Sequence, residues 1–279
     1  MANGVENPYR TDKVADALFV GRERLLATLC AAVRSERNAI RAVIGGRGMG
    51  KSSLAAQLKV RLGADALTVV ASGTAQRIAR EIGEALGVAV AVDTPVEALV
   101  TAARKGRVAL VLDEIEKVRG DPAGIGFLDN LREAYVLAGG RLALIVLGGT
   151  AVYELLVDQA SPFLRIAGGI HTLGGLERDE AAELLRVPLD LEISDDVVDA
   201  LWTDTSGHPW LLQMFMEHAV DGAPSHAEIV AHIPAAIREA SRSCARSRFR
   251  SGGTTSKLGD RISIAAWCAS PLRSPAAGG

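Results

Sequence analysis

The sequence predicts an α/β fold in which helices cover both faces of a parallel sheet, followed by a small all-helical subdomain. Short apolar runs without polar alternation are typical of strands that are buried on both faces. Such runs occur at Ile40–Ile44, Ala66–Val70, Val108–Leu112 and Leu142–Leu147, with a weaker one at Gly169–Leu173. Helical segments lie between them, and this alternation of strand and helix indicates a doubly wound sheet.

Helices are indicated where apolar residues recur every three or four positions. In the first part of the chain such spacing predicts helices at Glu23–Val33, Lys51–Leu62, Ala75–Leu86, Pro95–Ala103 and Phe127–Leu137. Beyond about Leu176 strand signals stop, and the spacing predicts helices at Glu177–Leu185, Asp195–Trp202, Pro209–Val220 and Ala227–Ala240. We therefore expect an α/β core at residues 1–175 and a helical lid at 176–240. A basic tail at 241–279 is expected to be poorly ordered or the stub of a further domain.

Charge is unevenly distributed along the chain of 279 residues, whose formal net charge is −2. The stretch from Ile237 to the end contains eight Lys or Arg and two Asp or Glu, a local charge of +6 that leaves −8 for the rest. An acidic body is a poor generic binder of nucleic acid, so any such role would fall to the tail. The plain alternative is a solvated basic end.

The expected compartment is the cytoplasm. The three cysteines (Cys30, Cys244 and Cys268) lie far apart and show neither disulfide nor metal-site spacing. The N-terminus has no apolar signal core, and the longest apolar stretch, Leu142–Val152, is far shorter than the roughly 20 residues that span a bilayer. No membrane association is therefore expected.

A glycine-rich octapeptide stands between the first predicted strand and the following helix. It reads Gly45-Gly46-Arg47-Gly48-Met49-Gly50-Lys51-Ser52 and fits the P-loop pattern G-x-x-x-x-G-K-[ST] at every position. Glycines let the backbone curl so that its N–H groups face phosphate oxygens, and the helix dipole adds positive potential there. Lys51 is expected at the β- and γ-phosphates and Ser52 on Mg²⁺. Ser53, the next residue, is included among the expected nucleotide-binding residues.

Two carboxylates end the apolar strand Val108–Leu112, about 60 residues after the P-loop. Asp113 is expected to hold Mg²⁺ directly or through water, and Glu114 to orient and polarise the attacking water. Taken alone, such a strand can simply end in acidic residues. Together with the P-loop it predicts a P-loop NTPase that binds ATP and Mg²⁺.

The segment Phe19-Val20-Gly21-Arg22-Glu23, followed by Leu25-Leu26, resembles the F-x-G-R-E element of AAA+ and STAND-type ATPases, among them the initiator-like ATPases of bacteria and archaea. Asn7-Pro8-Tyr9 is similar to the opening segment of bacterial members. In that family the element lies beside the adenine. The resemblance thus implies base-pocket roles for Val20, Gly21 and Arg22, although Arg22 can equally form a salt bridge at a helix start.

The same resemblance implies two further residues in the core. Leu147-Gly148-Gly149-Thr150 ends a strand where the family keeps its sensor 1 residue, which makes Thr150 a candidate sensor of the γ-phosphate. The alternative is that Thr150 caps a helix that begins at Ala151. Ser161-Pro162-Phe163-Leu164-Arg165 resembles a segment between sensor 1 and the lid, and Arg165 is the candidate arginine finger.

In the lid, Ser206-Gly207-His208-Pro209-Trp210-Leu211-Leu212-Gln213 resembles the G-x-P signature of STAND proteins, in which the proline packs near the nucleotide. Pro209 also suits a first helical turn, and a lone His208 is more often structural than phosphate-binding. The resemblance spans about Asn7–Ala240. It departs from the family in a short segment after the second strand and in the lack of a recognisable winged-helix or effector region after Ser241.

The leading hypothesis is an ATPase that acts as a nucleotide-dependent switch on a macromolecular partner of unknown identity. An arginine finger supplied by a second copy would require a homo-oligomer on ATP binding. The alternatives are an ATP-binding interaction module with little turnover, a small-molecule phosphotransferase, and an initiator-like ATPase that associates with DNA.

Overall fold

The structure is a computed structural model that describes residues 6–9, 18–35, 40–152, 169–221, 223 and 225–233. These residues divide into two compact units. The core unit comprises the described residues of Val14–Gly174. The helical unit comprises the described residues of Met1–Lys13 together with those of Gly175–Gly279.

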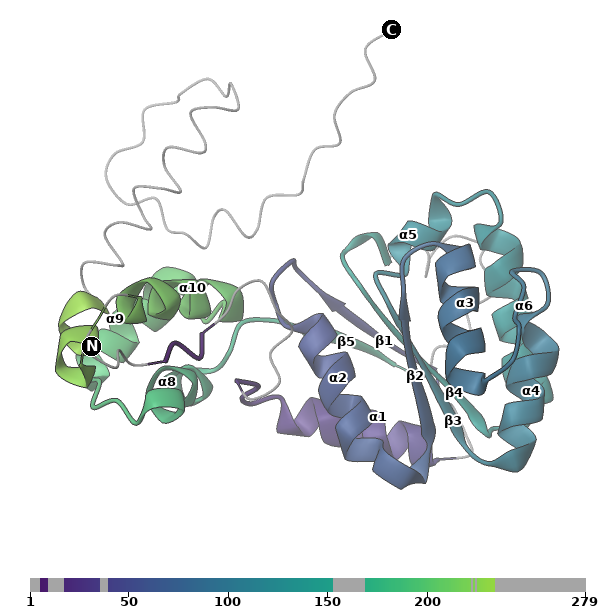
Figure 1. The fold of residues 1–279 in the computed structure, drawn as a ribbon, viewed down its shortest axis with the longest axis horizontal. Helices are drawn as coiled ribbons and strands as arrows, with labels where there is room; N and C mark the ends of the chain where they lie inside the picture. Colours follow the sequence, from purple (N-terminus) through teal and green to yellow (C-terminus); the bar gives the residue numbers. More distant parts are fainter. Residues whose placement is uncertain are drawn as a thin grey trace, which may run out of the picture. The chain divides into compact units, whose positions relative to one another are not determined.

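A sheet of parallel strands forms the centre of the core unit (Figure 1). The strands are β1 (Ile40–Gly45), β2 (Leu67–Ser72), β3 (Val108–Asp113), β4 (Leu142–Gly148) and β5 (Ile170–Leu173). Their spatial order is β2-β3-β4-β1-β5, so β1 lies between β4 and β5. Because all the strands are parallel, the loops that follow them meet at one edge of the sheet.

Helices cover both faces of this sheet (Figure 1). Helices α1 (Glu23–Arg34) and α2 (Lys51–Leu62) pack on one face, with Leu26, Leu29 and Leu58 in the shared core. The other face carries α3 (Ala75–Leu86), α4 (Pro95–Lys105), α5 (Glu116–Arg119) and α6 (Gly124–Leu137). Every residue of β3 and β4 is buried, which explains why these strands lack polar alternation. The predicted α/β class is confirmed.

The helical unit is built from α8 (Arg178–Arg186), the short helix η3 (Val187–Leu189), α9 (Asp195–Thr205) and α10 (Pro209–Val220). In the core unit, the short helix η1 (Gly63–Asp65) directly follows α2. Residues 226–233 are helical as well. A reciprocal capping box between Glu177 and Glu180 begins α8. Its formation satisfies backbone donors that the first turn of a helix leaves unpaired.

The N-terminal segment belongs to the helical unit although it precedes the core in the sequence. Tyr9 is buried, and its hydroxyl donates to the carbonyls of Leu184 and Leu185 at 3.2 and 3.1 Å. These carbonyls lie in the last turn of α8, where a helix has no partners of its own for them. Asn7 donates to the Glu217 carbonyl at 3.1 Å, near the end of α10. Residues 6–9 therefore connect two helix ends.

Several predicted element bounds differ from those in the structure by a few residues. The second strand covers Leu67–Ser72 rather than Ala66–Val70, and α6 begins at Gly124 rather than Phe127. The single turn α5 was not predicted, because four residues are too few to show a helical period. Residues 234–279, which include the predicted tail, lie outside the described residues, as does the predicted finger Arg165.

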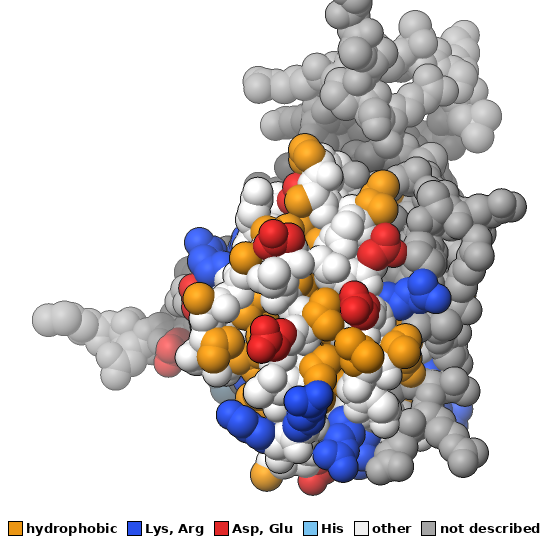
Figure 2. Space-filling view, turned by 90° about the vertical axis from the view of Figure 1, so that its right-hand side faces the viewer, with side chains coloured by type: hydrophobic (Ala, Val, Ile, Leu, Met, Phe, Trp, Pro, Cys, Tyr) orange, Lys and Arg blue, Asp and Glu red, His pale blue; other side chains and the backbone are white. Residues whose placement is uncertain are grey.

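Within the described residues no helix is both long and apolar enough to cross a membrane. The face of the core unit on the side of α4 and α6 mixes hydrophobic, acidic and basic side chains (Figure 2). In this view acidic side chains lie among hydrophobic ones, and basic side chains lie at the lower end and at both sides, so the described part of this face is not of a single sign.

Candidate nucleotide-binding site

The glycine-rich loop lies where the sequence predicts it, between the end of β1 at Gly45 and the start of α2 at Lys51. Gly48 and Gly50 have φ values of 75° and 87°, a left-handed conformation that favours glycine. Gly45 is required for another reason. A Cβ atom there would lie 3.0 Å from both the Cβ and the carbonyl oxygen of Leu173, because β5 passes close by. The loop therefore has the backbone freedom that a phosphate cradle needs.

The other residues of the loop differ in exposure. Gly46 and Arg47 are exposed, whereas Met49 is half-buried and packs against the core on the α1–α2 face. Ser53 is half-buried in the first turn of α2. The exposed side of the loop thus consists of the segment whose N–H groups are expected to meet phosphate.

The Lys51 side chain folds back onto the first two residues of the glycine-rich loop. Its ammonium group donates to the carbonyls of Gly45 and Gly46 at 2.9 and 2.8 Å. Burial lowers the pKa of Lys51, and the nearby carboxylates of Asp113, Glu116 and Glu114 oppose that shift, with Asp113 the largest of them. A lysine whose positive charge is favoured by carboxylates of the same unit remains able to neutralise phosphate charge.

Ser52 and Asp113 form the most specific contact of the site. The Ser52 hydroxyl donates to Oδ2 of Asp113 at 2.5 Å, which joins the first turn of α2 to the end of β3. The other carboxylate oxygen, Oδ1, accepts the backbone N–H of Glu114 at 2.9 Å. Asp113 is buried, so its orientation is fixed by these bonds. A hydroxyl and a carboxylate are oxygen ligands of the kind that Mg²⁺ prefers, and the pair fits this ion.

Glu114 has an unusual backbone. Its φ of 53° is left-handed, a conformation that a non-glycine residue adopts at a cost of about 1–3 kcal/mol and that often occurs at functional sites. Its Oε2 atom lies 2.5 Å from the ammonium nitrogen of Lys117, and both side chains are about half exposed. The Glu114 side chain is therefore partly open to solvent at the end of β3.

Two residues near β3 were missed by sequence reasoning. Glu116 accepts the backbone N–H of Gly149 at 3.0 Å, and Lys117 pairs with Glu114. Both follow the strand within the four residues Glu114-Ile115-Glu116-Lys117, so the signal was the run of charges itself. Thr150, the predicted sensor, is exposed and directly precedes the helical residues Ala151 and Val152. This position is compatible with both of the roles expected for it.

The segment before the P-loop forms a tight turn at the start of α1. Gly21 and Arg22 have φ values of 67° and 64°, and the Arg22 guanidinium donates to the carbonyl of Gly174, just beyond β5. Val20, Gly21 and Arg22 are all half-buried. Glu23, the first residue of α1, pairs with Arg61 of α2 at 2.6 Å. The bond from Arg22 thus ties the turn that contains Val20, Gly21 and Arg22 to the residue that follows β5.

In the helical unit, His208 and Pro209 occupy the start of α10. His208 is buried, and its Nδ1 atom accepts the Leu211 N–H at 3.5 Å, while Pro209 is the first helical residue. The structural role weighed for His208 therefore agrees with its contacts. The nucleotide contact predicted for Pro209 stays a prediction.

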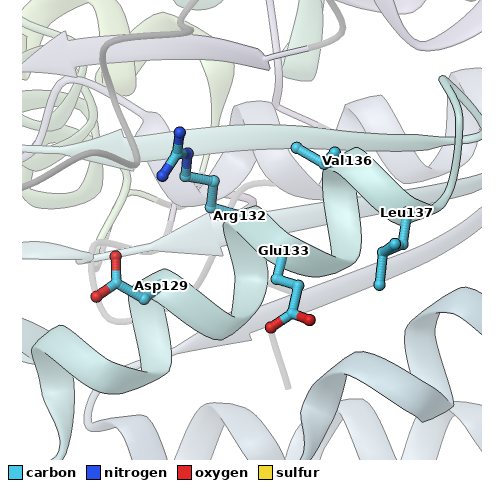
Figure 3. A pocket seen from close by; sticks show the side chains of 5 residues that line it. All are labelled: Asp129, Arg132, Glu133, Val136 and Leu137. Atoms are coloured by element: carbon cyan, nitrogen blue, oxygen red, sulfur yellow. The ribbon is translucent and has the colours of Figure 1, made fainter.

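A hollow of about 540 Å³ lies along the outer face of α6 and is separate from the P-loop (Figure 3). Its described lining consists of the side chains of Asp129, Arg132, Glu133, Val136 and Leu137. Helix α6 packs on the face of the sheet opposite to α2. The hollow therefore contributes nothing to the site at Lys51.

No protein-family model and no curated protein matches the sequence. Solved structures do match the fold. The ORC1 protein of Aeropyrum pernix in complex with DNA is 20% identical with a TM-score of 0.58, and the match covers 87% of this chain and 71% of that one. CDC6P of Pyrobaculum aerophilum is 18% identical with a TM-score of 0.59, covering 79% and 68%. The ORC2 protein of Aeropyrum pernix in its ADPNP–ADP complexes is 13% identical with a TM-score of 0.58, covering 80% and 71%.

The matches to ORC1 and CDC6P cover 87% and 79% of this chain. At such identities they establish architecture, and the predicted resemblance to initiator-like ATPases is supported at that level. The chain has the fold of the ORC1 and CDC6P structures, with its glycine-rich loop between β1 and α2.

Proposed function

We propose that this protein is a Mg²⁺-dependent ATPase that acts as a nucleotide-dependent switch. The observation that supports it best is the 2.5 Å contact between Ser52 and Asp113 beside the glycine-rich loop and Lys51. Binding of a nucleoside triphosphate with its metal ion requires backbone N–H groups for the phosphates, a lysine to neutralise their charge and oxygen ligands for the metal. The glycine-rich loop, Lys51 and the Ser52–Asp113 pair can supply these at the end of the sheet where the strands finish. The solved ORC2 structure of the same fold is a complex with ADPNP and ADP.

Each residue of the site has a defined part in this proposal. The N–H groups of Gly46–Gly50 and the N-terminus of α2 bind the phosphates, and Lys51 adds its charge at the β- and γ-positions. Ser52 and Asp113 hold Mg²⁺, which would neutralise charge on the phosphate oxygens. Glu114 accepts a proton from the water whose oxygen bonds to the γ-phosphorus, as the bond from that phosphorus to the β–γ bridging oxygen breaks.

The remaining predicted residues complete the proposal. Val20, Gly21 and Arg22 contact the adenine, Pro209 approaches the nucleotide from the helical unit, and Thr150 senses the γ-phosphate. Arg165 supplies the arginine finger to a second copy, which makes turnover depend on a homo-oligomer. The partner of the switch is a macromolecule in the cytoplasm.

A second candidate function is that of a DNA-associated ATPase. It is favoured by the solved ORC1 structure, which is a complex with DNA, and by the local charge of the stretch from Ile237 onward. This proposal predicts that the intact chain binds duplex DNA with a strong salt dependence and that deletion after Ser241 abolishes binding. Failure of the intact chain to bind DNA at low salt would exclude it.

The test of the leading proposal is ATP turnover by the purified chain over a wide range of protein concentrations. Wild type is compared with Lys51→Ala, with Glu114→Gln and with Lys59→Ala, a control that removes an exposed lysine from the same helix. We expect turnover per chain to rise with concentration, and Glu114→Gln to lower it by about 100-fold or more while ATP still binds. The control should match wild type.

The alternatives give different results in the same experiment. Wild type that binds ATP through Lys51 but hydrolyses none at any concentration would refute the ATPase and support the interaction module. Transfer of phosphate to a small acceptor by the monomer would instead support a phosphotransferase.

A further inference from the structure

Glu116 connects the segment after β3 to the segment after β4. Its Oε1 atom accepts the backbone N–H of Gly149 at 3.0 Å. One residue earlier, the Ile115 N–H donates to the Leu147 carbonyl at 3.3 Å. The ends of the two central strands are thus joined by a backbone bond and a side-chain bond, and Gly149 leads directly into Thr150.

The chain leaves space for this carboxylate at Gly148. A Cβ atom on Gly148 would lie 2.3 Å from Oε2 of Glu116 and 2.3 Å from Cγ2 of Val152. Any larger side chain would have to displace Glu116 or the helical residues that follow Thr150. The glycine at this position therefore has a packing reason, which is the close approach of both the Glu116 and the Val152 side chains.

The second carboxylate oxygen of Glu116, Oε2, is buried without a hydrogen-bond partner among the residues that the structure describes. Burial of an anionic oxygen without a donor is unfavourable unless a nearby charge compensates it. The P-loop begins beside this segment, because Gly148 pairs in register with Ile44, the residue that precedes Gly45. The charge of Glu116 also favours the protonated form of Lys51 and so acts to raise the pKa of that side chain. Glu116 is therefore bonded to Gly149, which follows the strand that lies beside the start of the P-loop.

We propose that Glu116 is a positioning residue that couples the nucleotide held by Lys51 to the loop Gly148–Thr150. When Lys51 engages the phosphates, the electrostatic environment of Glu116 changes, and its bond to Gly149 transmits the change to the loop. The residue would thereby help to distinguish ATP from ADP. This inference rests on the proposed nucleotide-binding function and adds to it a role for a side chain outside the metal-binding pair and the proposed base.

Two substitutions separate the bond from the charge. Glu116→Ala removes both, whereas Glu116→Gln retains an oxygen that can accept the Gly149 N–H but removes the charge. Glu133→Ala is the control, since Glu133 is an exposed glutamate of the same unit on α6. Equilibrium binding of ATP and ADP is measured for each protein, together with amide hydrogen exchange of the peptide that contains Gly149, with each nucleotide.

For Glu116→Ala we expect ATP affinity to fall about tenfold, the loss of one hydrogen bond to a charged group, with ADP affinity changed less than about twofold. Exchange of the Gly149 peptide should differ between ATP and ADP in wild type and become equal in Glu116→Ala. Glu116→Gln should restore part of the difference. A protein that merely lost stability would weaken the binding of both nucleotides alike.

The outcomes distinguish this inference from the function on which it rests. If wild type binds and hydrolyses ATP but Glu116→Ala keeps the wild-type ratio of ATP to ADP affinity, the coupling role is refuted and the ATPase stands. If wild type binds neither nucleotide, both are refuted.

Discussion

The ammonium nitrogen of Lys117 lies 2.5 Å from the Oε2 atom of Glu114, three residues earlier in the chain. In this arrangement the carboxylate that we propose as the base is engaged by a cation from its own segment. The two side chains are 54% and 47% exposed, and ion pairs of that kind contribute up to about 1 kcal/mol. The ion pair with Lys117 therefore favours one position of the Glu114 side chain, but weakly enough that the carboxylate can leave it.

Removing Lys117 should raise ATP turnover. Because the restraint is worth up to about 1 kcal/mol, we expect Lys117→Ala to increase turnover per chain by about two- to fivefold at saturating ATP. Lys59→Ala again serves as the control, because Lys59 is exposed and belongs to neither side of this ion pair. A drop in turnover similar to that of Glu114→Gln would show instead that Lys117 assists the reaction.

The Ser52–Asp113 pair predicts a metal dependence that can be measured without turnover. In wild type, chelation of Mg²⁺ should weaken ATP binding by about tenfold or more, equivalent to about 1.4 kcal/mol. Ser52→Ala and Asp113→Asn should bind ATP as weakly with Mg²⁺ as without it. Retention of the full Mg²⁺ effect in both variants would place the metal elsewhere.

Tyr9 should stabilise the helical unit. Tyr9→Phe removes the hydroxyl that donates to the Leu184 and Leu185 carbonyls, and we expect a loss of about 1–2 kcal/mol in the free energy of unfolding. All three tryptophans, Trp202, Trp210 and Trp267, lie outside residues 14–174. Urea unfolding followed by tryptophan fluorescence therefore reports on the part of the chain that Tyr9 contacts.

Tyr135→Phe, in α6 of the core unit, is the matched control for this measurement. It should leave the fluorescence transition where it is in wild type. An unchanged transition for Tyr9→Phe as well would mean that the hydroxyl contributes nothing to the helical unit.

His171 on β5 should make the core unit less stable in mild acid. Burial lowers the pKa of His171, and Arg41 lowers it further, so the folded state binds this proton less readily than the unfolded state. Stability is then fully present above the ordinary histidine pKa of about 6.5 and decreases as pH falls from there toward the lowered value. Thermal unfolding followed by circular dichroism at pH 7.5 and 5.5 measures the difference.

We expect His171→Leu to show a smaller drop in Tm between these two pH values than wild type does. His218→Gln, at an exposed position in the helical unit, is compared in parallel. The same drop in wild type and in His171→Leu would assign the acid sensitivity to other groups.

Much of the fold follows from local sequence patterns. Helices Lys51–Leu62, Ala75–Leu86 and Pro209–Val220 have the predicted bounds, since each begins at a clear signal: the P-loop, a capping threonine at Thr74, and a proline at N1. The buried strands were recognisable because both of their faces are covered. The order of the strands was not predicted, because it depends on contacts between segments far apart in the chain.

The candidate site was predictable only in part, for the same reason. The P-loop and the carboxylates at the end of β3 are each encoded by a short continuous motif. Both motifs follow parallel strands of one sheet, so the contact between Ser52 and Asp113 could be expected. The bond from Glu116 to Gly149 spans 33 residues, and that from Tyr9 to Leu184 spans 175. No local pattern encodes either. The left-handed Glu114 is likewise a product of the surrounding fold rather than of its own propensity.

The most direct test of the account is calorimetric titration of ATP with Mg²⁺ into wild type, Lys51→Ala and Lys59→Ala. We predict one ATP bound per chain, affinity lowered about tenfold or more in Lys51→Ala, and wild-type affinity in Lys59→Ala. Equal affinity in wild type and Lys51→Ala, or no binding by wild type, would contradict the claim that this loop is a nucleotide site.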